Sequence, residues 1–425
     1  MSATFYQLVL FFVRPLVKLR LRLRARREPA YGERWEERFG HVPAGVACGP
    51  VWFHTVSAGE TIAAAPLIRT LREDFPDLPF LVTTMTPTGS VQAVERLSDI
   101  ADHCYAPYDF PEAVERFYAQ VVPKALVLME TELWPNLISM ACARGIPVML
   151  VNARLSERSA RGYSRVSGLV RKMLNSIDLI VCQAPAHRDR FIALGADPER
   201  VQVAGSVKFD QFLPDDFDVQ LLSLRRRFGM DTDIPVWIAA STHPGEDEQV
   251  LTAHRMLCER FGEIRLVVVP RHPVRVNEVV ALIENAGLTY SRQSDAGGDG
   301  QVVIGDVMGT LQYMYGLADV AFVGGSLVAV GGHNPIEPAL CGLPVAVGPY
   351  QYNFAEVMEA LSEAGSLVTV TDAEDLAQVV GGWLEGEELR RRAGRAGLEV
   401  VAANRGAQEK VGRLIRDCVT AAVMK

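Results

Sequence analysis

The sequence lacks the features of a disulfide-stapled or nucleic-acid-binding protein. Its seven cysteines are scattered from Cys48 to Cys418, and no two of them form a Cys-x-x-Cys pair. We therefore expect reduced thiols in a cytoplasmic protein, rather than a disulfide framework or a zinc site. The net charge of −8 is spread over 425 residues, which argues against nucleic acid as a partner. With 49% hydrophobic residues, the chain can bury large cores, and its length predicts two or more domains.

Near the N-terminus, the apolar segment of residues 5–13 falls short of the roughly 20 residues that a membrane-spanning helix needs. Six basic residues follow it between Lys18 and Arg27, whereas a signal peptide carries its charge first. We expect residues 1–27 to form an interfacial membrane anchor with a polybasic collar, which would keep the globular part on the cytoplasmic side. The alternative is a basic tail on an ordinary first helix. The segment Pro29–Gly40 mixes basic and aromatic residues and is expected to extend the membrane-facing surface.

Short apolar runs alternate with stretches of helix length along the whole chain. The strands predicted in the first half are 51–56, 80–84, 125–129, 148–152, 179–182 and 201–203. Those predicted in the second half are 235–240, 266–269, 302–304, 320–323, 345–347 and 367–370. Strands separated in this way indicate parallel sheets that are covered by helices on both faces.

We therefore predict an α/β fold of two Rossmann-like, doubly wound parallel-sheet domains that face a cleft. A polar link that contains proline places the domain boundary near residue 210. The predicted division is an anchor over 1–27, an N-terminal domain over 28–209, a C-terminal domain over 210–387 and C-terminal helices over 388–425. Sheets of this kind bind ligands at the carboxyl ends of their strands, so the site is expected there, in the cleft.

The glycine-rich stretch Phe322–Leu340 is the most informative single segment. It is predicted to run from a buried strand, through a loop with four glycines, into a helix opened by Asn334 and Pro335. Glycines let a loop turn its N–H groups toward a ligand, and a helix N-terminus suits a phosphate. Glu337, one turn into the helix, is well placed to accept hydrogen bonds from a ribose. The pattern indicates a site for a nucleotide monophosphate or sugar nucleotide, with a purely structural turn as the alternative.

Polar residues also follow the strands of the first half. Ser57 and Glu60 have the spacing of a capping box before an apolar helix, so capping and catalysis are both open for Glu60. The segment Glu130–Pro135 follows the third strand, where a helix cap with Trp134 in the core is the alternative to a site. Lys208 lies at the start of the link, where a solvated lysine is the usual structural explanation.

In the second half, two strands end in segments rich in hydrogen-bond donors, Ser241–Glu246 and Pro270–Pro273. Arg271 is of the residue type best suited to phosphate. The third strand runs into Asp306–Thr310, another possible helix start. His272 has the chemistry of a metal ligand, but no second histidine or carboxylate has ligand spacing, so we expect no metal at this position.

Together these motifs resemble the 3-deoxy-D-manno-octulosonic acid (Kdo) transferases that act on lipid A precursors. The matching segments occur in the order of that family and span nearly the whole chain: His54–Glu60, Met129–Asn136, Gly205–Phe209, Val269–His272, Met308–Gly309, Phe322–Ser326, Gly331–Pro338 and Asn404–Ala407. Thr310 is the local departure, because other members can carry a different residue there. The resemblance implies the GT-B fold, which agrees with the two-domain prediction.

The resemblance implies transfer of Kdo, with inversion, from CMP-Kdo to a glucosamine hydroxyl of lipid IVA, the lipid A precursor, at the cytoplasmic face of the inner membrane. Glu60 is then the general base, provided that its cap loosens during turnover, and Glu130 and Lys208 stabilise the transition state. The implied CMP contacts are Arg271, His272, Met308, Gly309, Thr310, Asn334, Pro335, Ile336 and Glu337. No metal or other cofactor is implied, because helix dipoles and basic side chains supply the positive charge. Inner-membrane lipids are the remaining expected partner.

Other functions are compatible with parts of this pattern. A GT-B transferase that uses a UDP-sugar on a lipid acceptor would have a similar two-domain sequence. A sugar-nucleotide epimerase would also use UDP and would need no anchor. A membrane-bound nucleotide sensor would retain its cellular function when Glu60 is changed to glutamine, whereas an enzyme would lose it.

Overall fold

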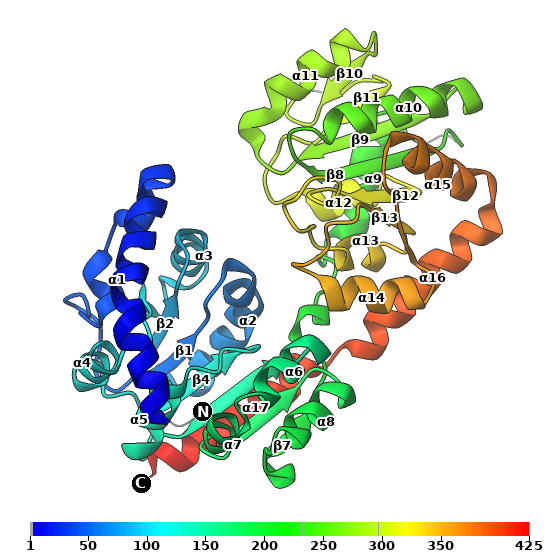
Figure 1. Cartoon of the computed structure of the whole chain (residues 1–425). Coiled ribbons are helices and arrows are strands. Elements are labelled where there is room, and N and C mark those ends of the chain that lie inside the picture. Colours follow the sequence, from blue (N-terminus) through cyan, green and yellow to red (C-terminus); the bar gives the residue numbers. More distant parts are fainter. Residues whose placement is uncertain (1–2, 231–232, 296, 425) are drawn as a thin grey trace. The chain divides into compact units, whose positions relative to one another are not determined.

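The computed structural model describes residues 3–230, 233–295 and 297–424 of the chain (Figure 1). Met1, Ser2 and Lys425, which belong to the expected anchor and C-terminal helices, lie outside the described residues. The chain forms two compact units. The N-terminal unit contains residues up to Asp210 together with Arg405 and the residues after it, and the C-terminal unit runs from Gln211 to Asn404.

The described part of the N-terminal unit is built on one parallel sheet of seven strands. The strands are β1 (Val51–His54), β2 (Phe80–Thr84), β3 (Asp102–Tyr105), β4 (Ala125–Met129), β5 (Val148–Ala153), β6 (Leu179–Cys182) and β7 (Val201–Val203). Their order is β3-β2-β1-β4-β5-β6-β7, and all neighbours pair in parallel.

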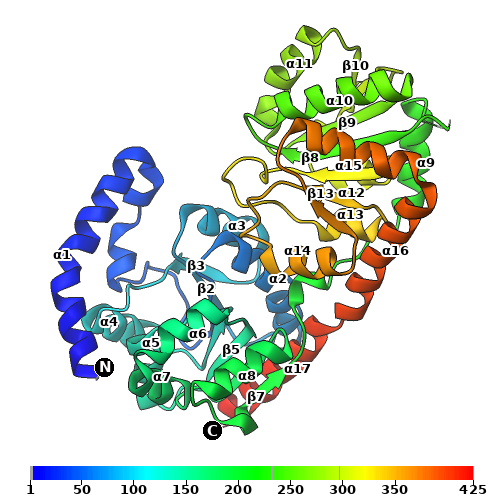
Figure 2. The same cartoon turned by 45° about the vertical axis from the view of Figure 1, so that its right-hand side comes forward.

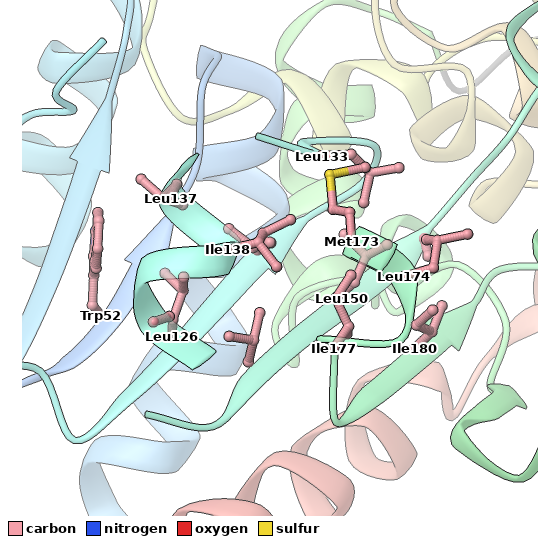
Figure 3. Packing of buried hydrophobic residues seen from close by; sticks show 14 of the residues in the cluster. Trp52, Leu126, Leu133, Leu137, Ile138, Leu150, Met173, Leu174, Ile177 and Ile180 are labelled. Carbon is pink, nitrogen blue, oxygen red and sulfur yellow. The ribbon is translucent and has the colours of Figure 1, made fainter. Parts of the chain in front are cut away.

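Helices cover both faces of this sheet. The helices of the unit are α1 (Ala3–Arg27), α2 (Ala58–Asp74), α3 (Pro87–Leu97), α4 (Pro111–Val121), α5 (Pro135–Ala143), α6 (Glu157–Ser164), α7 (Ser167–Leu174), α8 (Pro185–Ala193) and α17 (Ala407–Val423). Helices α4, α5, α7 and α8 bury one face, where Trp52 packs (Figure 3). Helices α2, α3 and α17 bury the other face, which receives Val51 and Phe53. This alternation along β1 is the two-residue period of a strand that is buried on both sides.

The described part of the C-terminal unit has a second parallel seven-stranded sheet, in the order β10-β11-β9-β8-β12-β13-β14. Its strands are β8 (Val236–Thr242), β9 (Arg265–Pro270), β10 (Tyr290–Arg292), β11 (Val302–Ile304), β12 (Val320–Val323), β13 (Val345–Val347) and β14 (Leu367–Thr369). Its helices are α9 (Phe217–Arg227), α10 (Asp247–Phe261), α11 (Val276–Asn285), α12 (Leu311–Tyr315), α13 (Ile336–Leu340), α14 (Ala355–Glu363), α15 (Ala373–Glu385) and α16 (Glu387–Asn404). Helices α10, α11 and α15 cover one face, and α10 lies beside α15 in both views (Figures 1 and 2). Helices α9 and α12 cover the other face.

The twelve predicted strands all form, and their ends lie within two residues of the predicted ones. The edge strands β3 and β10 were missed because polar and charged residues interrupt their apolar pattern, as in Asp102–Tyr105. The C-terminal helices do not form one segment. Helix α16 belongs to the C-terminal unit, whereas α17 returns to the N-terminal unit and packs beside α2 (Figure 2).

Each sheet has a point at which the order of its strands reverses. In the N-terminal unit this point lies between β1 and β4, and in the C-terminal unit it lies between β8 and β12. The loops that leave neighbouring strands on the two sides of such a point turn apart and expose a ligand-binding edge. Glu60 lies in the first turn of α2, directly after the loop that leaves β1, and Glu130 directly follows β4. The loops after β8 and β12 carry Glu246 and the glycine-rich stretch.

Helix α1 has two apolar faces. Leu10 and Val17 pack against Phe39 and Phe110 of the N-terminal unit. A second stripe is exposed at successive turns of the helix, at Leu8, Phe12, Leu16, Leu19 and Leu23. Among the residues described, no helix combines the length and apolar character that crossing a membrane requires.

The segment Pro29–Gly40 does not extend this exposed surface as a whole. Two of the residues expected to face a membrane are buried, because Arg38 is 1% exposed and Phe39 is 8% exposed. The Arg38 guanidinium lies 3.9 Å from the centroid of the Tyr105 ring. The prediction was wrong for these two residues, because Arg38 stacks on Tyr105 and Phe39 packs against Phe110 inside the unit.

Candidate functional site

Glu60 closes a capping box at the start of α2. Its backbone N–H donates to the Ser57 hydroxyl at 3.3 Å, and that hydroxyl donates to Glu60 Oε1 at 2.9 Å. Glu60 Oε2 accepts the N–H of Val56 at 2.8 Å. The side chain is 7% exposed. The capping interpretation is therefore confirmed, and catalysis by the same carboxylate requires these bonds to loosen.

The environment of Glu60 favours its protonated form. Burial, followed by the negative charges of Glu132 and Glu130, raises the pKa of Glu60 to about 8. Burial also raises the pKa of Glu132, whose carboxylate accepts the Trp134 indole N–H at 2.7 Å. A carboxyl group with a pKa near the working pH has the property that a general base needs.

Glu130 is held between two cations. Its Oε1 lies 2.8 Å from Lys208 Nζ, and its Oε2 lies 2.9 Å from Arg154 Nε. Glu130 and Lys208 are almost buried, with side chains that are 9% and 11% exposed. Lys208 is therefore not the solvated lysine of the structural alternative. In a water-poor site, these two cations can stabilise developing negative charge.

The backbone around this cluster adopts an unusual conformation. Glu130 has a φ of 54° and Asn152 a φ of 51°, both in the left-handed region that side chains rarely adopt. The Asn152 side-chain oxygen accepts the N–H of Val207 at 3.2 Å, which fixes the turn that presents Lys208. Strain of this kind persists where the surroundings hold it in place, as at functional sites.

The carboxylates after β4 do not cap α5. The first N–H groups of that helix, those of Asn136 and Leu137, donate to the Asp109 carboxylate at 3.0 and 2.8 Å. Trp134 is half-buried, and its ring meets the buried His54 ring edge-on at 4.7 Å between centroids. Glu130 and Glu132 therefore do not form the helix cap that their place before α5 suggested.

The glycine-rich loop after β12 does not direct its first N–H groups toward a ligand. The N–H groups of Gly325, Ser326 and Leu327 donate to the carboxylate of Glu246, which is completely buried. The prediction that these amides receive a phosphate is wrong for all three. The following helix α13 has five residues, so the dipole expected at its N-terminus is weaker than that of a longer helix.

Because these loop N–H groups bind Glu246, histidine side chains line this edge of the sheet instead. His243 Nε2 and His333 Nε2 lie 2.8 Å apart, with nearly parallel rings, so one ring donates a proton that the other accepts. The His272 ring meets His243 edge-on at 5.8 Å between centroids. Burial, followed by the positive charge of Arg271, lowers the pKa of His333 to about 3. Burial also lowers the pKa of His243 below its ordinary value of 6.5, so both rings of the stacked pair are neutral at pH 7.

The remaining predicted nucleotide contacts form two local groups. Asn334 donates to Glu337 Oε1 at 3.0 Å and accepts the N–H of Ile336, next to the buried Pro335. Burial raises the pKa of Glu337. The other group lies after β11.

In that second group, Met308 is 71% exposed, and Gly309 has a φ of 79°. The Thr310 hydroxyl donates to the Val307 carbonyl at 2.7 Å. These residues are thus brought to the carboxyl edge of the same sheet that carries Arg271 and His272.

Sequence reasoning missed three residues that shape these edges. Arg154 follows β5 as Glu130 follows β4, so its place after a strand was the available signal. Glu246 belonged to the donor-rich segment Ser241–Glu246, but its role as an acceptor gave no signal, because three of its partners lie about 80 positions away in the chain. Asp109 gave no signal, because its partners lie about 30 positions away.

The chain has extensive similarity to known proteins. Residues 33–211 match the family model described as 3-Deoxy-D-manno-octulosonic-acid transferase (kdotransferase), and residues 247–400 match Glycosyl transferases group 1. The chain is 39% identical to the 3-deoxy-D-manno-octulosonic acid transferase of Haemophilus influenzae, covering 97% of both chains. It is 36% identical to that of Bordetella pertussis, covering 97% of this chain and 98% of the relative.

The structure of Staphylococcus aureus MnaA with UDP superimposes with a TM-score of 0.55 at 16% identity, over 88% of this chain and 97% of that one. This likeness shows the fold alone, two parallel-sheet α/β domains resembling GT-B glycosyltransferases. The relatives show the family, because they are similar over almost their entire length. The chain therefore belongs to the 3-deoxy-D-manno-octulosonic acid (Kdo) transferase family of glycosyltransferases.

Proposed function

We propose that the protein moves Kdo from CMP-Kdo to a glucosamine hydroxyl of lipid IVA, with inversion and without a metal. Family membership supports Kdo as the transferred sugar. The observation that carries the proposed chemistry is the buried Glu60 carboxyl, with its pKa raised to about 8 at the switch point of the N-terminal sheet. Glu130 follows the neighbouring strand β4, and its ion pair with Lys208, which comes after β7, places charge at the same edge.

In the proposed step, ionised Glu60 takes the proton of the acceptor hydroxyl while the hydroxyl oxygen forms a bond to the anomeric carbon of Kdo. The bond from that carbon to the phosphate oxygen breaks, and its electron pair leaves with CMP. One displacement of this kind inverts the anomeric configuration. The hydrogen bonds of Glu60 to Val56 and Ser57 are exchanged for the one to the acceptor.

The proposed role of Lys208 is to oppose negative charge on the Kdo carboxylate or on the leaving phosphate. Glu130 then has a clear task, because it holds Lys208 and Arg154 in place at 2.8 and 2.9 Å. Basic side chains of this kind provide the charge that a metal supplies in other transferases. In the C-terminal unit, Arg271 and His272 are proposed to contact the nucleotide phosphate, and Glu337 the ribose.

Helix α1 is proposed to dock the protein on the cytoplasmic face of the inner membrane, where a lipid acceptor resides. The exposed stripe of leucine and phenylalanine side chains supports this role, because apolar residues on one face of a helix can enter the interfacial region. Some basic residues of the collar have other contacts in the structure. Lys18 lies over the Phe39 ring and Arg24 over the Tyr31 ring.

The direct test is to incubate the purified full chain with CMP-Kdo and a tetra-acylated lipid A precursor, and to measure the product mass. We expect the lipid to gain Kdo and CMP to be released. A parallel incubation with UDP-sugars tests the alternative donor class. Transfer from a UDP-sugar with none from CMP-Kdo would replace the proposed function.

A further inference from the structure

Glu246 is a buried carboxylate that the proposed reaction does not use. It ends the turn after β8 and directly precedes α10, and its side chain is 0% exposed. Its two oxygens accept hydrogen bonds from four backbone N–H groups. The donors are those of His243 and Gly325 on Oε2, at 2.9 and 2.7 Å, and of Ser326 and Leu327 on Oε1, at 3.0 and 2.9 Å.

Three of these donors are consecutive, which makes the loop after β12 an anion-binding nest. Nests of successive N–H groups bind phosphate in many nucleotide sites. Here a carboxylate of the same chain fills the nest. A Cβ atom at Gly324 would lie 2.9 Å from Glu246 Oε2 and 2.7 Å from the Ser241 carbonyl oxygen, so glycine is required where the carboxylate enters.

Through this carboxylate, the loop after β8 and the loop after β12 are joined, and each of them carries a histidine. The N–H of His243 and that of Gly325 share one carboxylate oxygen. The N–H of His333 returns to the Gly324 carbonyl at 3.2 Å. The two ring Nε2 atoms then meet at 2.8 Å, so the stacking of the pair depends on the spacing that Glu246 sets between the loops.

We propose that Glu246 is a positioning residue of the nucleotide-binding edge. By filling the nest, it sets the positions of His243 and His333, and it leaves side chains, including Arg271, to receive the anionic part of a nucleoside monophosphate ester. The inference rests on the proposed function, since it assumes that the nucleotide binds at this edge. Under this proposal, side chains that can move recognise the phosphate, and the backbone N–H groups of the loop after β12 do not.

The test is Glu246→Gln in the full chain. Glutamine keeps the shape of the side chain but turns an amide N–H₂ toward two of the four N–H donors. We expect the dissociation constant for CMP, measured by titration calorimetry, to rise by about tenfold or more, because charge-assisted hydrogen bonds at the edge are lost. KM for CMP-Kdo should rise similarly, while KM for the lipid acceptor changes by less than about twofold. Glu248→Gln, an exposed carboxylate on the same helix, is the matched control.

A double-mutant cycle with His333→Ala separates positioning from a general loss of stability. If Glu246 acts through the histidine pair, the two effects on CMP affinity do not add, because the first substitution already displaces the ring. Additive effects would overturn the proposal. An unchanged dissociation constant in the folded fraction, with only a lower melting temperature, would overturn it as well.

A second variant covers the case in which Glu246→Gln does not fold. Glu246→Asp keeps the charge but is too short to reach all four amides, and a smaller rise in the CMP dissociation constant is expected. The wild type is also titrated with UDP. If it binds UDP and not CMP, the proposed donor fails, and the same comparison of variants is made with UDP, so that the two failures are distinguished.

Discussion

At the switch point of the N-terminal unit, the buried carboxylate of Glu130 is held by the side-chain cations of Lys208 and Arg154. At the corresponding point of the C-terminal unit, the buried carboxylate of Glu246 is held by four backbone N–H groups. Both carboxylates lie at the switch point of a similar sheet, Glu130 after β4 and Glu246 after β8, yet their partners differ in kind.

We expect this difference to correspond to a division between catalysis at the N-terminal edge and nucleotide binding at the C-terminal edge. Side-chain ion pairs can exchange partners and respond to charge that develops on a substrate. Backbone N–H groups cannot turn away unless the loop itself moves, so a carboxylate in a nest makes that loop rigid. We expect substitutions at the N-terminal edge to change the rate of transfer, and substitutions at the C-terminal edge to change nucleotide affinity.

The largest expected effect is that of Glu60→Gln. Loss of the general base should lower kcat for transfer by about 10²–10⁴-fold, because glutamine cannot take the acceptor proton. The dissociation constant for CMP should stay within about twofold, since the residue belongs to the other unit. Glu73→Gln, an exposed carboxylate on the same helix, is the control. Wild-type transfer by the Glu60 variant would contradict the assignment of the base.

Lys208→Met should lower kcat by about 10²-fold, because one donor of positive charge is removed from the site. Glu130 keeps Arg154, so the free energy of unfolding should fall by only about 1–3 kcal/mol in urea denaturation. The exposed Lys172→Met is the matched control. A lower affinity for CMP with an unchanged rate of transfer would contradict this division between the two edges, because Lys208 would then act in nucleotide binding.

Phe12→Ser tests the exposed stripe of α1. Its side chain is 66% exposed, so the free energy of unfolding should change by less than about 0.5 kcal/mol. Binding to vesicles of phosphatidylethanolamine and phosphatidylglycerol, measured by co-sedimentation, should weaken by about tenfold, because apolar area is lost from the docking face.

Val219→Ser, which is 69% exposed on α9, should bind vesicles as the wild type does. Point substitution is sharper than deletion of α1, because the Tyr6 hydroxyl donates to Asp109, which caps α5. Equal weakening by the Phe12 and Val219 variants would show that the stripe has no special role.

The smallest expected effect is a shift in the pH profile. Because Glu60 has to be ionised and its pKa is about 8, kcat/KM should rise with pH up to about 8. The charge of Glu132 helps to raise that pKa, so Glu132→Gln should move the ascending limb to lower pH. An unmoved limb would show that another group controls the profile.

The raised pKa of Glu60 also affects the stability of the folded protein. The folded-state pKa of Glu60 lies above its ordinary value of 4.5, so ionisation opposes folding. Relative to Glu60→Gln, the wild type should therefore lose stability as pH rises from about 4.5 to about 8. Urea denaturation at several pH values measures this difference.

Most of the fold could be predicted because its central strands are continuous apolar runs. Strands such as Ala125–Met129 are buried on both faces, so neighbouring residues in the sequence carry the signal. The edge strand Tyr290–Arg292 has one sheet neighbour, β11, and an alternating pattern too short to recognise. Its position depends on that neighbour, which lies elsewhere in the sequence.

The site could be predicted in part. The motifs brought Glu60, Glu130 and Lys208 to attention, and the structure places the last two in one ion pair. The glycine-rich loop was recognised, but the direction of its amides was not. That direction depends on Glu246, which comes from a different loop, and local sequence patterns do not include such a partner.

By itself, the sequence determined two parallel α/β units with polar residues at their strand ends, because hydrophobic burial along a strand is a local property. Only the tertiary structure decided which polar groups satisfy one another. Lys208 reaches Glu130 across 78 positions, and Glu246 reaches Gly325 across 79. The pKa of Glu60 and the closing of the nest follow from desolvation and from partners that folding brings together.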